Sequence, residues 1–418
     1  MSEKRGTDYS QASQALINYT NGCSIIGSHH ISSRHTGGVM NTSKAIVAGL
    51  LALGCALPAA AEIRLGASVS ATGPAGILGD PEARTLELLV QELNARGGIK
   101  GEQIKLVLYD DGGDANKART FATRLVEDDE VQAIIGGTTT GTSMSILSVA
   151  EDAKVPFISL AGAIDIIDPV KPYTFKTPHT DRMACQKVFA DMRKNGWTKV
   201  ALIGSTDGFG ASMQAQCKAV AGQYGIELVG SETYEPKDAD MTAQLTKIRG
   251  IPGVQAVLNP GFGQSAAVLA RNYRQLGMSL PFYASHGVAS QGYIDLAGAD
   301  VVEGFRLPGT ALLVADLLPA SDPQAAPSIA YKKAFEAKTG APVGTFGGYA
   351  HDAFLILVDA LNRADSTKPT AIRDAIEKTS KLAGTTGVYT FSPTDHLGLD
   401  LSAFRVLEIR GGKWKVVD

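Results

Sequence analysis

The sequence predicts an α/β fold of two doubly wound (Rossmann-like) lobes, because three observations agree. From residue 62 onward, short apolar runs rich in β-branched residues alternate with amphipathic stretches, which is typical of parallel βαβ units. The pattern restarts after residues 173–177, about one domain's length further on. The chain of 418 residues is also longer than one domain usually is.

In the first lobe we expect strands and helices in strict alternation. The strands are 63–69, 104–109, 133–135, 157–159 and 173–177, and the helices are 82–95, 115–127 and 142–152. The first helix carries an apolar stripe at Leu86, Leu89, Val90 and Leu93, which is the spacing of one helical face. It is expected to end at Gly97-Gly98, where a left-handed cap suits glycine.

The second lobe repeats this order. Helices are expected at 182–195, 211–224, 241–249 and 264–276, and strands at 199–203, 227–229 and 256–258. The segment 304–312 is expected to cross between lobes, followed by helices 327–339, 348–363 and 369–379 and by β segments 387–391, 403–408 and 414–417. Open α/β sheets bind ligands at the carboxyl ends of their strands, so we expect the site in loops between facing lobes.

Residues 40–61 have the layout of a cleaved signal peptide. Lys44 gives a positive start, residues 45–57 are apolar, and Ala59-Ala60-Ala61 offers small residues for cleavage. The apolar run is shorter than the roughly 20 residues that span a bilayer. Residues 1–39 are interpreted as a non-translated or disordered extension, and the mature protein is expected to be soluble and exported.

The net charge bears on the class of partner, and the cysteine positions bear on whether a disulfide can form. A net charge of −3 without a dense basic cluster makes nucleic acid an unsuitable partner. Cys23 and Cys55 precede the expected mature start, whereas Cys185 and Cys217 fall on helices flanking one strand. An exported protein could join these two in a disulfide, and two buried thiols fit the sequence equally well.

No motif for catalysis is found. The chain lacks Gly-x-Ser-x-Gly, Gly-x-x-x-x-Gly-Lys, Gly-x-Gly-x-x-Gly after a strand, Cys-x-x-Cys and His-Glu-x-x-His. His351 has no second ligand one helical turn on. We therefore expect a protein that is not an enzyme and that needs no cofactor or metal.

The segment 136–145 is rich in threonine and serine, between a strand and a helix. Free N–H groups and the positive end of a helix favour an anion there. Simple capping of the helix by a hydroxyl explains the same residue types.

Several segments resemble, in order and spacing, the periplasmic branched-chain amino-acid (Leu/Ile/Val) binding proteins, which are type I solute-binding proteins. These segments are Ile63–Gly66 with Thr72-Gly73-Pro74, Asn94–Gly101, Asp110-Asp111, Ile134–Gly137, Pro156–Ala161, Asp207 with Phe209-Gly210, and Tyr349–Ala353. The resemblance covers nearly all of 62–418.

The resemblance implies a Venus-flytrap fold, periplasmic binding protein type I, with three hinge crossovers near 178–181, 308–312 and 383–388. Lobe 1 would comprise 62–180 and 311–386, and lobe 2 would comprise 181–310 and 387–418. It also implies a monomer in the periplasm that captures a small ligand without catalysis. An ABC permease and ATPase complex at the inner membrane would be its partner.

The resemblance also indicates a ligand site. It places a ligand carboxylate at Thr140, Gly141 and Thr142, and it offers the carbonyl of Ala161 to a ligand ammonium. Ala163 stands where amino-acid binders have threonine. The second lobe contributes Phe209, Phe262 and His286, and Ile77 with Leu78 would add an apolar wall.

The histidine at 286 argues against an amino acid, because amino-acid binders usually carry an acidic residue there. An enclosed ammonium without a carboxylate partner is costly. The favoured ligand is therefore an aromatic or other apolar monocarboxylic acid. Two alternatives stay open, namely an amino-acid binder in which Asp165 or Asp207 pairs with the ammonium and an amide- or urea-sensing binding protein. His286 could also be satisfied within its own loop.

Overall fold

The computed structural model describes residues 62–417. A first sheet has the order β2-β1-β3-β4-β5, and all its neighbours are parallel. Its strands are β1 (Glu62–Val69), β2 (Gln103–Asp110), β3 (Ala133–Gly136), β4 (Phe157–Ser159) and β5 (Thr174–Lys176). The parallel order places the loops after β3, β4 and β5 side by side at one edge of the sheet.

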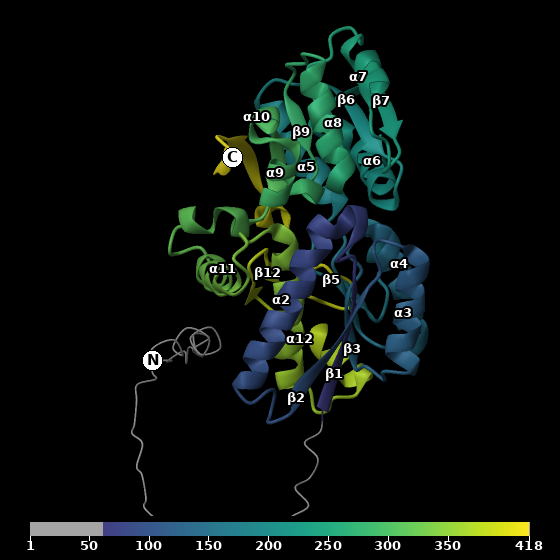
Figure 1. The fold of residues 1–418 in the computed structure, drawn as a ribbon, viewed down its shortest axis with the longest axis vertical. Helices are drawn as coiled ribbons and strands as arrows, with labels where there is room; N and C mark the ends of the chain where they lie inside the picture. Colours follow the sequence, from purple (N-terminus) through teal and green to yellow (C-terminus); the bar gives the residue numbers. More distant parts are fainter. Residues whose placement is uncertain (1–61, 418) are drawn as a thin grey trace, which may run out of the picture. The chain divides into compact units, whose positions relative to one another are not determined.

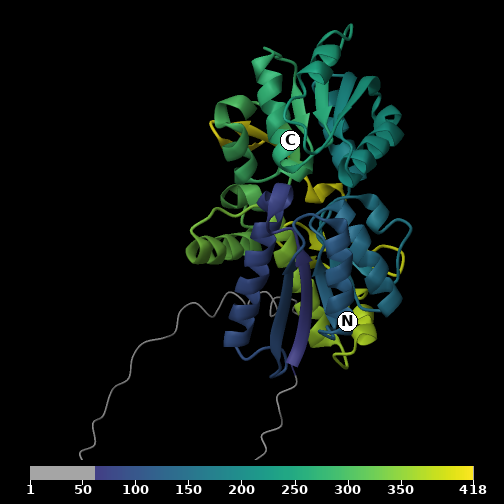
Figure 2. The same cartoon turned by 45° about the vertical axis from the view of Figure 1, so that its right-hand side comes forward.

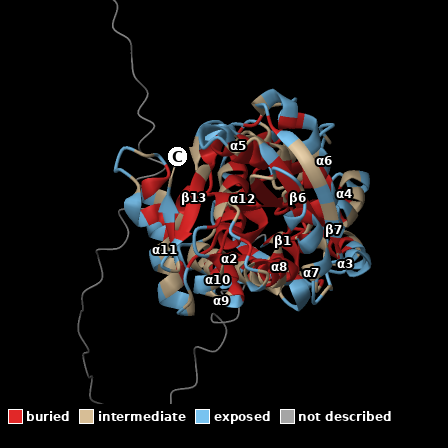
Figure 3. Ribbon diagram, turned by 90° about the horizontal axis from the view of Figure 1, so that it is seen from above, coloured by how far each residue is buried: buried red, intermediate tan, exposed pale blue. Residues whose placement is uncertain are grey.

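Helices cover both faces of this sheet. On one face α2 (Gly76–Ala95) packs against α12 (Thr345–Arg363), and on the other lie α3 (Ala115–Glu127) and α4 (Thr140–Ala153) (Figure 1). The helices α11 (Ala325–Thr339) and α13 (Pro369–Ile376) complete this lobe. Buried residues concentrate in the strands and on the inner helix faces (Figure 3).

A second sheet has seven strands in the order β14-β13-β10-β9-β8-β6-β7. They are β6 (Lys199–Ser205), β7 (Glu227–Tyr234), β8 (Ala256–Asn259), β9 (Phe282–Ala284), β10 (Arg306–Gly309), β13 (Arg405–Arg410) and β14 (Lys413–Val416). The last two run antiparallel. Its helices are α5 (Asp181–Lys194), α6 (Gly208–Val220), α7 (Thr242–Arg249), α8 (Gly263–Gln275), α9 (Gln291–Ala297) and the short α10 (Ala299–Val302). The two sheets form separate lobes joined by crossing segments (Figure 2).

Several elements differ from the sequence expectation. Helix α2 begins at Gly76 rather than residue 82, with Pro81 inside it. A proline removes one backbone hydrogen bond, and the buried apolar face of α2 continues through that position. Strand β9 and the two helices that follow it, α9 and α10, were not expected.

The third crossing lies later than expected. Residues 383–388 form a hairpin in which β11 (Leu382–Ala383) pairs with β12 (Val388–Tyr389). A hydrogen bond of 2.8 Å from Gly384 N to Gly387 O closes this hairpin. Tyr389 and Phe391 are buried in the core of the first sheet. The segment 387–391 therefore packs with the first lobe, and assigning it to the second was wrong. The crossing falls between Phe391 and the start of β13.

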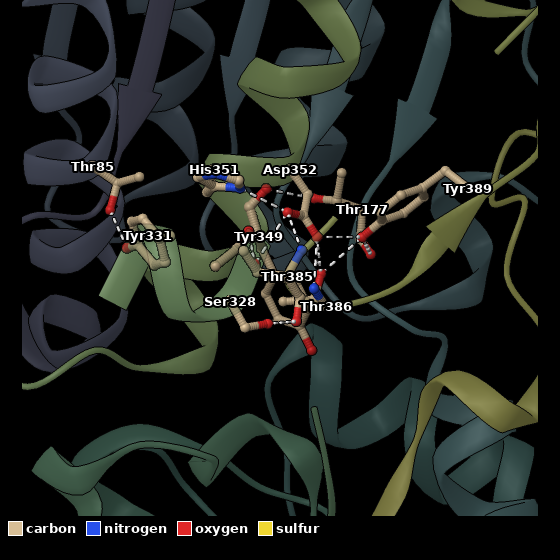
Figure 4. A network of polar contacts seen from close by, with 11 residues as sticks. Thr85, Thr177, Ser328, Tyr331, Tyr349, His351, Asp352, Thr385, Thr386 and Tyr389 are labelled. Atoms are coloured by element: carbon tan, nitrogen blue, oxygen red, sulfur yellow. Dashed lines mark hydrogen bonds and ion pairs between the residues drawn. The ribbon is translucent and has the colours of Figure 1, made fainter. Parts of the chain in front are cut away.

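A buried carboxylate holds the hairpin to α12 (Figure 4). Asp352 accepts bonds from the backbone N–H groups of Thr385 and Thr386, each 2.7 Å long, and from the Thr386 hydroxyl at 2.6 Å. The Tyr389 hydroxyl lies 3.2 Å from the same carboxylate and 3.1 Å from the Thr177 carbonyl. The network thus ties α12 both to the hairpin and to the first crossing after β5.

In the second lobe, Cys185 of α5 and Cys217 of α6 form a disulfide with their Cα atoms 5.1 Å apart. This settles the pairing that the sequence left open.

Among residues 62–417, none of the helices has the length and apolar character needed to cross a membrane. The expected signal peptide, together with Cys23 and Cys55, lies outside these residues.

Candidate ligand-binding site

A cavity lies between the loops of the two sheets and contains about 350 Å³ of non-atom space, part of it open to solvent. Both lobes supply the lining, which consists of Leu78, Thr138, Thr139, Thr140, Leu160, Gly162, Pro178, Phe209, Phe262, His286, Gly287, Phe346 and Tyr349.

The first lobe contributes the N-terminus of α4. Thr139 caps the helix by accepting from Thr142 N at 3.2 Å, and the Thr142 hydroxyl accepts from Thr139 N at 3.1 Å. Capping therefore uses Thr142, which is fully buried and not part of the lining. The buried Thr140 hydroxyl, in contrast, has no hydrogen-bond partner within residues 62–417. Together with the unused N–H groups of the first helical turn, including that of Gly141, it makes this point suitable for an anion.

The loop after β4 approaches the second lobe closely. Gly162 lines the cavity, whereas Ala161 and Ala163 are buried beside it. A Cβ atom on Gly162 would lie 2.7 Å from His286 Nε2 and 2.9 Å from Phe209 Cε2. The close approach of the two lobes therefore requires glycine at this position.

Three rings from the second lobe form the facing wall. Phe209 lies at the start of α6, Phe262 caps α8, and His286 begins the turn after β9. The centroid of the Phe209 ring is 5.9 Å from that of Phe262 and 5.3 Å from that of His286, in edge-to-face arrangements. Such pairs are favourable contacts between aromatic rings, so the wall is apolar and preformed.

His286 is a neutral side chain in this wall. Burial holds its pKa well below the ordinary value, and the nearby His179 and Lys176 lower the pKa further. Neither ring nitrogen has a hydrogen-bond partner in the described part of the chain. A neutral imidazole offers one donor and one acceptor, so His286 can hydrogen-bond a ligand. The alternative in which His286 is hydrogen-bonded within its own loop is not what the structure shows.

Acidic side chains do not reach this cavity in the described residues. Asp207 uses one carboxylate oxygen to cap α6 through Phe209 N and Gly210 N, each at 2.9 Å, and the other to accept from Ser205. Asp165 is exposed to solvent and lies outside the lining. Behind Thr138, buried Glu82 accepts the threonine hydroxyl at 2.5 Å, and burial raises its pKa well above the ordinary value.

Half of the expected site residues line the cavity. They are Leu78, Thr140, Phe209, Phe262 and His286. Ile77 packs at the edge of the first core, and Gly141, Thr142, Ala161 and Ala163 lie next to lining residues. Sequence reasoning missed Phe346 and Tyr349 of α12, because only the fold brings this helix to loops that precede it by more than 160 residues.

Comparison of the sequence with known proteins assigns this chain to one protein family. A model of the family described as periplasmic binding protein matches residues 62–413. The Leu/Ile/Val-binding protein homolog 7 of Brucella abortus is 29% identical over 260 residues, which are 59% of this chain and 65% of that protein, slightly less than two thirds of its length. The leucine-, isoleucine-, valine-, threonine-, and alanine-binding protein of Pseudomonas aeruginosa is 25% identical over 82% of this chain and 87% of its own.

Solved structures have the same fold. An extracellular ligand-binding receptor from Rhodopseudomonas palustris HaA2 has a TM-score of 0.80 and 30% identity, covering 85% of this chain and 100% of that one. The substrate binding protein of a branched-chain amino acid transporter from Streptococcus pneumoniae, solved with isoleucine, has a TM-score of 0.76 and 24% identity, covering 85% of this chain and 99% of that one.

Proposed function

This chain belongs to the periplasmic binding protein family, and we propose that it captures an aromatic or other apolar monocarboxylic acid between its lobes for an ABC importer. Its partners would be the permease and ATPase complex of that importer at the inner membrane. We further propose that it acts as a monomer in the periplasm, without catalysis and without a cofactor.

One observation carries the choice of ligand, namely that the cavity has anion donors but no acid among its described lining residues. The Thr140 hydroxyl and the first turn of α4 would bind the carboxylate. Leu78, Leu160 and the two phenylalanines would contact the apolar body. An ammonium enclosed here would lack a carboxylate partner and would be costly to desolvate.

A branched-chain amino acid is the second candidate, because the Pseudomonas relative is named for binding leucine, isoleucine and valine. Isothermal titration separates the two candidates. We expect micromolar or tighter binding of cinnamate or benzoate and no binding of leucine. Tight binding of leucine alone would contradict the proposal.

A threonine variant tests the anion end. Thr140→Val should weaken acid binding by about 10- to 100-fold, because a hydrogen bond to a charged group is worth about 1.5–3 kcal/mol. Thr120→Val, on the exposed face of α3, is the matched control and should leave binding unchanged. Equal affinity of both variants for the acid would place the carboxylate elsewhere.

A further inference from the structure

Few buried polar side-chain atoms in residues 62–417 lack a hydrogen bond, and three of these residues line the cavity. They are Thr140, His286 and Tyr349. Thr140 belongs to the N-terminus of α4 and His286 to the wall of three rings, both described above. Tyr349 is 2% exposed, and its hydroxyl has no partner. A buried unpaired hydroxyl costs free energy that a ligand can recover.

The neighbouring tyrosines show that this hydroxyl is unusual. The Tyr331 hydroxyl lies 2.7 Å from the Thr85 hydroxyl, and that of Tyr389 reaches the Thr177 carbonyl. Tyr349 enters the same network only through its backbone, whose carbonyl accepts from the Thr177 hydroxyl at 3.0 Å (Figure 4). The network therefore fixes the position of Tyr349 on α12 and leaves its phenol free for the cavity.

Sheet order separates Tyr349 from the carboxylate end. Thr140 follows β3, Gly162 follows β4, and Pro178 and the anchor Thr177 follow β5. Adjacent strands lie about 4.8 Å apart, so the backbones of β3 and β5, with β4 between them, are about 10 Å from each other. The backbone of Tyr349, anchored to Thr177, therefore belongs to the β5 end, two strands from the strand that leads into Thr140.

We propose that the Tyr349 hydroxyl recognises a second polar group of the ligand, a hydroxyl or carbonyl oxygen separate from its carboxylate. The cargo would then be a hydroxy- or oxo-substituted monocarboxylic acid rather than an unsubstituted one. This inference rests on the proposed function. The tyrosine stays a neutral donor because burial, and then Asp352, raise its pKa far above the physiological range.

A matched pair of acids tests the inference. Cinnamate and 4-hydroxycinnamate differ only in a hydroxyl far from the carboxylate. Titration of the wild-type protein should give binding of 4-hydroxycinnamate at least about 10-fold tighter, because the unsubstituted acid leaves the phenol unpaired. In Tyr349→Phe the two affinities should become equal, through loss of affinity for 4-hydroxycinnamate alone.

Folding of the variant is checked independently. Tyr349→Phe removes a buried unpartnered hydroxyl, so its melting temperature should equal or exceed that of the wild type. Tyr331→Phe is the control, since its hydroxyl is partnered by Thr85 and lies outside the cavity lining. It should lower the melting temperature and keep the preference for 4-hydroxycinnamate.

The results separate the inference from the function beneath it. Equal wild-type affinities for the two acids, or equal losses for both in Tyr349→Phe, would overturn the inference and leave the proposed function standing. Binding of leucine with binding of neither acid would overturn both.

Discussion

The two lobes present different chemistry to the same cavity. The first offers a helix N-terminus and the Thr140 hydroxyl, whereas the second offers Phe209, Phe262 and neutral His286. Anion recognition depends on local backbone geometry, which a single loop can provide. Recognition of an apolar body needs side chains from several loops, and these are brought together only by the fold.

The lobes are also stabilised differently. In the first, Asp352 gathers backbone and hydroxyl donors from the hairpin around 384–389. In the second, a disulfide joins α5 to α6, the helix that carries Phe209. Each device fixes an element that reaches the cavity, so the comparison can be tested from both sides.

The largest effect is expected from placing a negative charge in the wall that the second lobe contributes to the cavity. His286→Glu would place a carboxylate beside that of the ligand, and like charges brought together cost several kcal/mol. We expect affinity for the acid to fall by about 1,000-fold and leucine binding to appear, measured by calorimetry. His286→Gln keeps a neutral donor and acceptor and should bind the acid within about 10-fold of wild type. Unchanged acid binding in His286→Glu would place the ligand away from this wall.

The next effect concerns stability of the second lobe. Replacing both Cys185 and Cys217 by alanine opens a link across 32 positions, which should reduce the free energy of unfolding by about 3–4 kcal/mol. Both tryptophans, Trp197 and Trp414, belong to this lobe, so their fluorescence in urea reports its unfolding. Wild-type protein in excess reductant is the control and should match the double variant. An unchanged midpoint would mean that the disulfide adds nothing to this lobe.

The contact between the walls should respond to one methyl group. Gly162→Ala forces its Cβ toward His286 and Phe209, and overpacking typically costs about 1–3 kcal/mol. Because this contact joins the lobes, we expect ligand affinity to fall by about 5- to 150-fold with little change in the melting temperature. Gly222→Ala is the matched control, since its Cβ would meet no described atom within 4 Å. Equal affinities for the two variants would show that the lobes bind ligand without this close approach.

The sequence predicts most of the fold because its periods are strong. The helix at 115–127 and the strand at 157–159 are confirmed to the residue. The predicted position of the third crossing was wrong, because a hydrogen bond between Gly384 and Gly387 closes a hairpin there. This hairpin returns the chain to the core of the first lobe. At the site, α4 begins earlier than expected, with Thr139 as its N-cap, and this leaves the hydroxyl of Thr140 without a hydrogen-bond partner. A residue pattern rarely predicts the end of a helix to within one or two residues. Tyr349 belongs to a segment that carries the resemblance, but its role at the site could not be predicted, because its free hydroxyl is a property of tertiary packing.

The smallest effect is a pH dependence from a buried lysine of the first lobe. Lys176 is the fully buried last residue of β5, and its ammonium donates to the carbonyls of Gly162 at 2.9 Å and Ala163 at 3.1 Å. Burial lowers its pKa to about 7, although Asp181 and then Asp165 oppose this. An unfolded lysine has a pKa of about 10.4, so above pH 7 the unfolded chain binds more protons than the folded one. The free energy of unfolding should therefore rise by about 1 kcal/mol from pH 7 to pH 8.

Urea unfolding at pH 7 and pH 8 measures this difference, and Lys176→Met is the comparison. Burial lowers the pKa of His179 to about 3 and that of His286 well below its ordinary value. Their contributions therefore change below about pH 6.5 and leave this interval to the lysine. The variant should lose the rise that the wild type shows. Equal slopes in both proteins would mean that Lys176 keeps its charge throughout, so that the loop after β4 is held against the hinge by a permanent ammonium rather than by a titrating one.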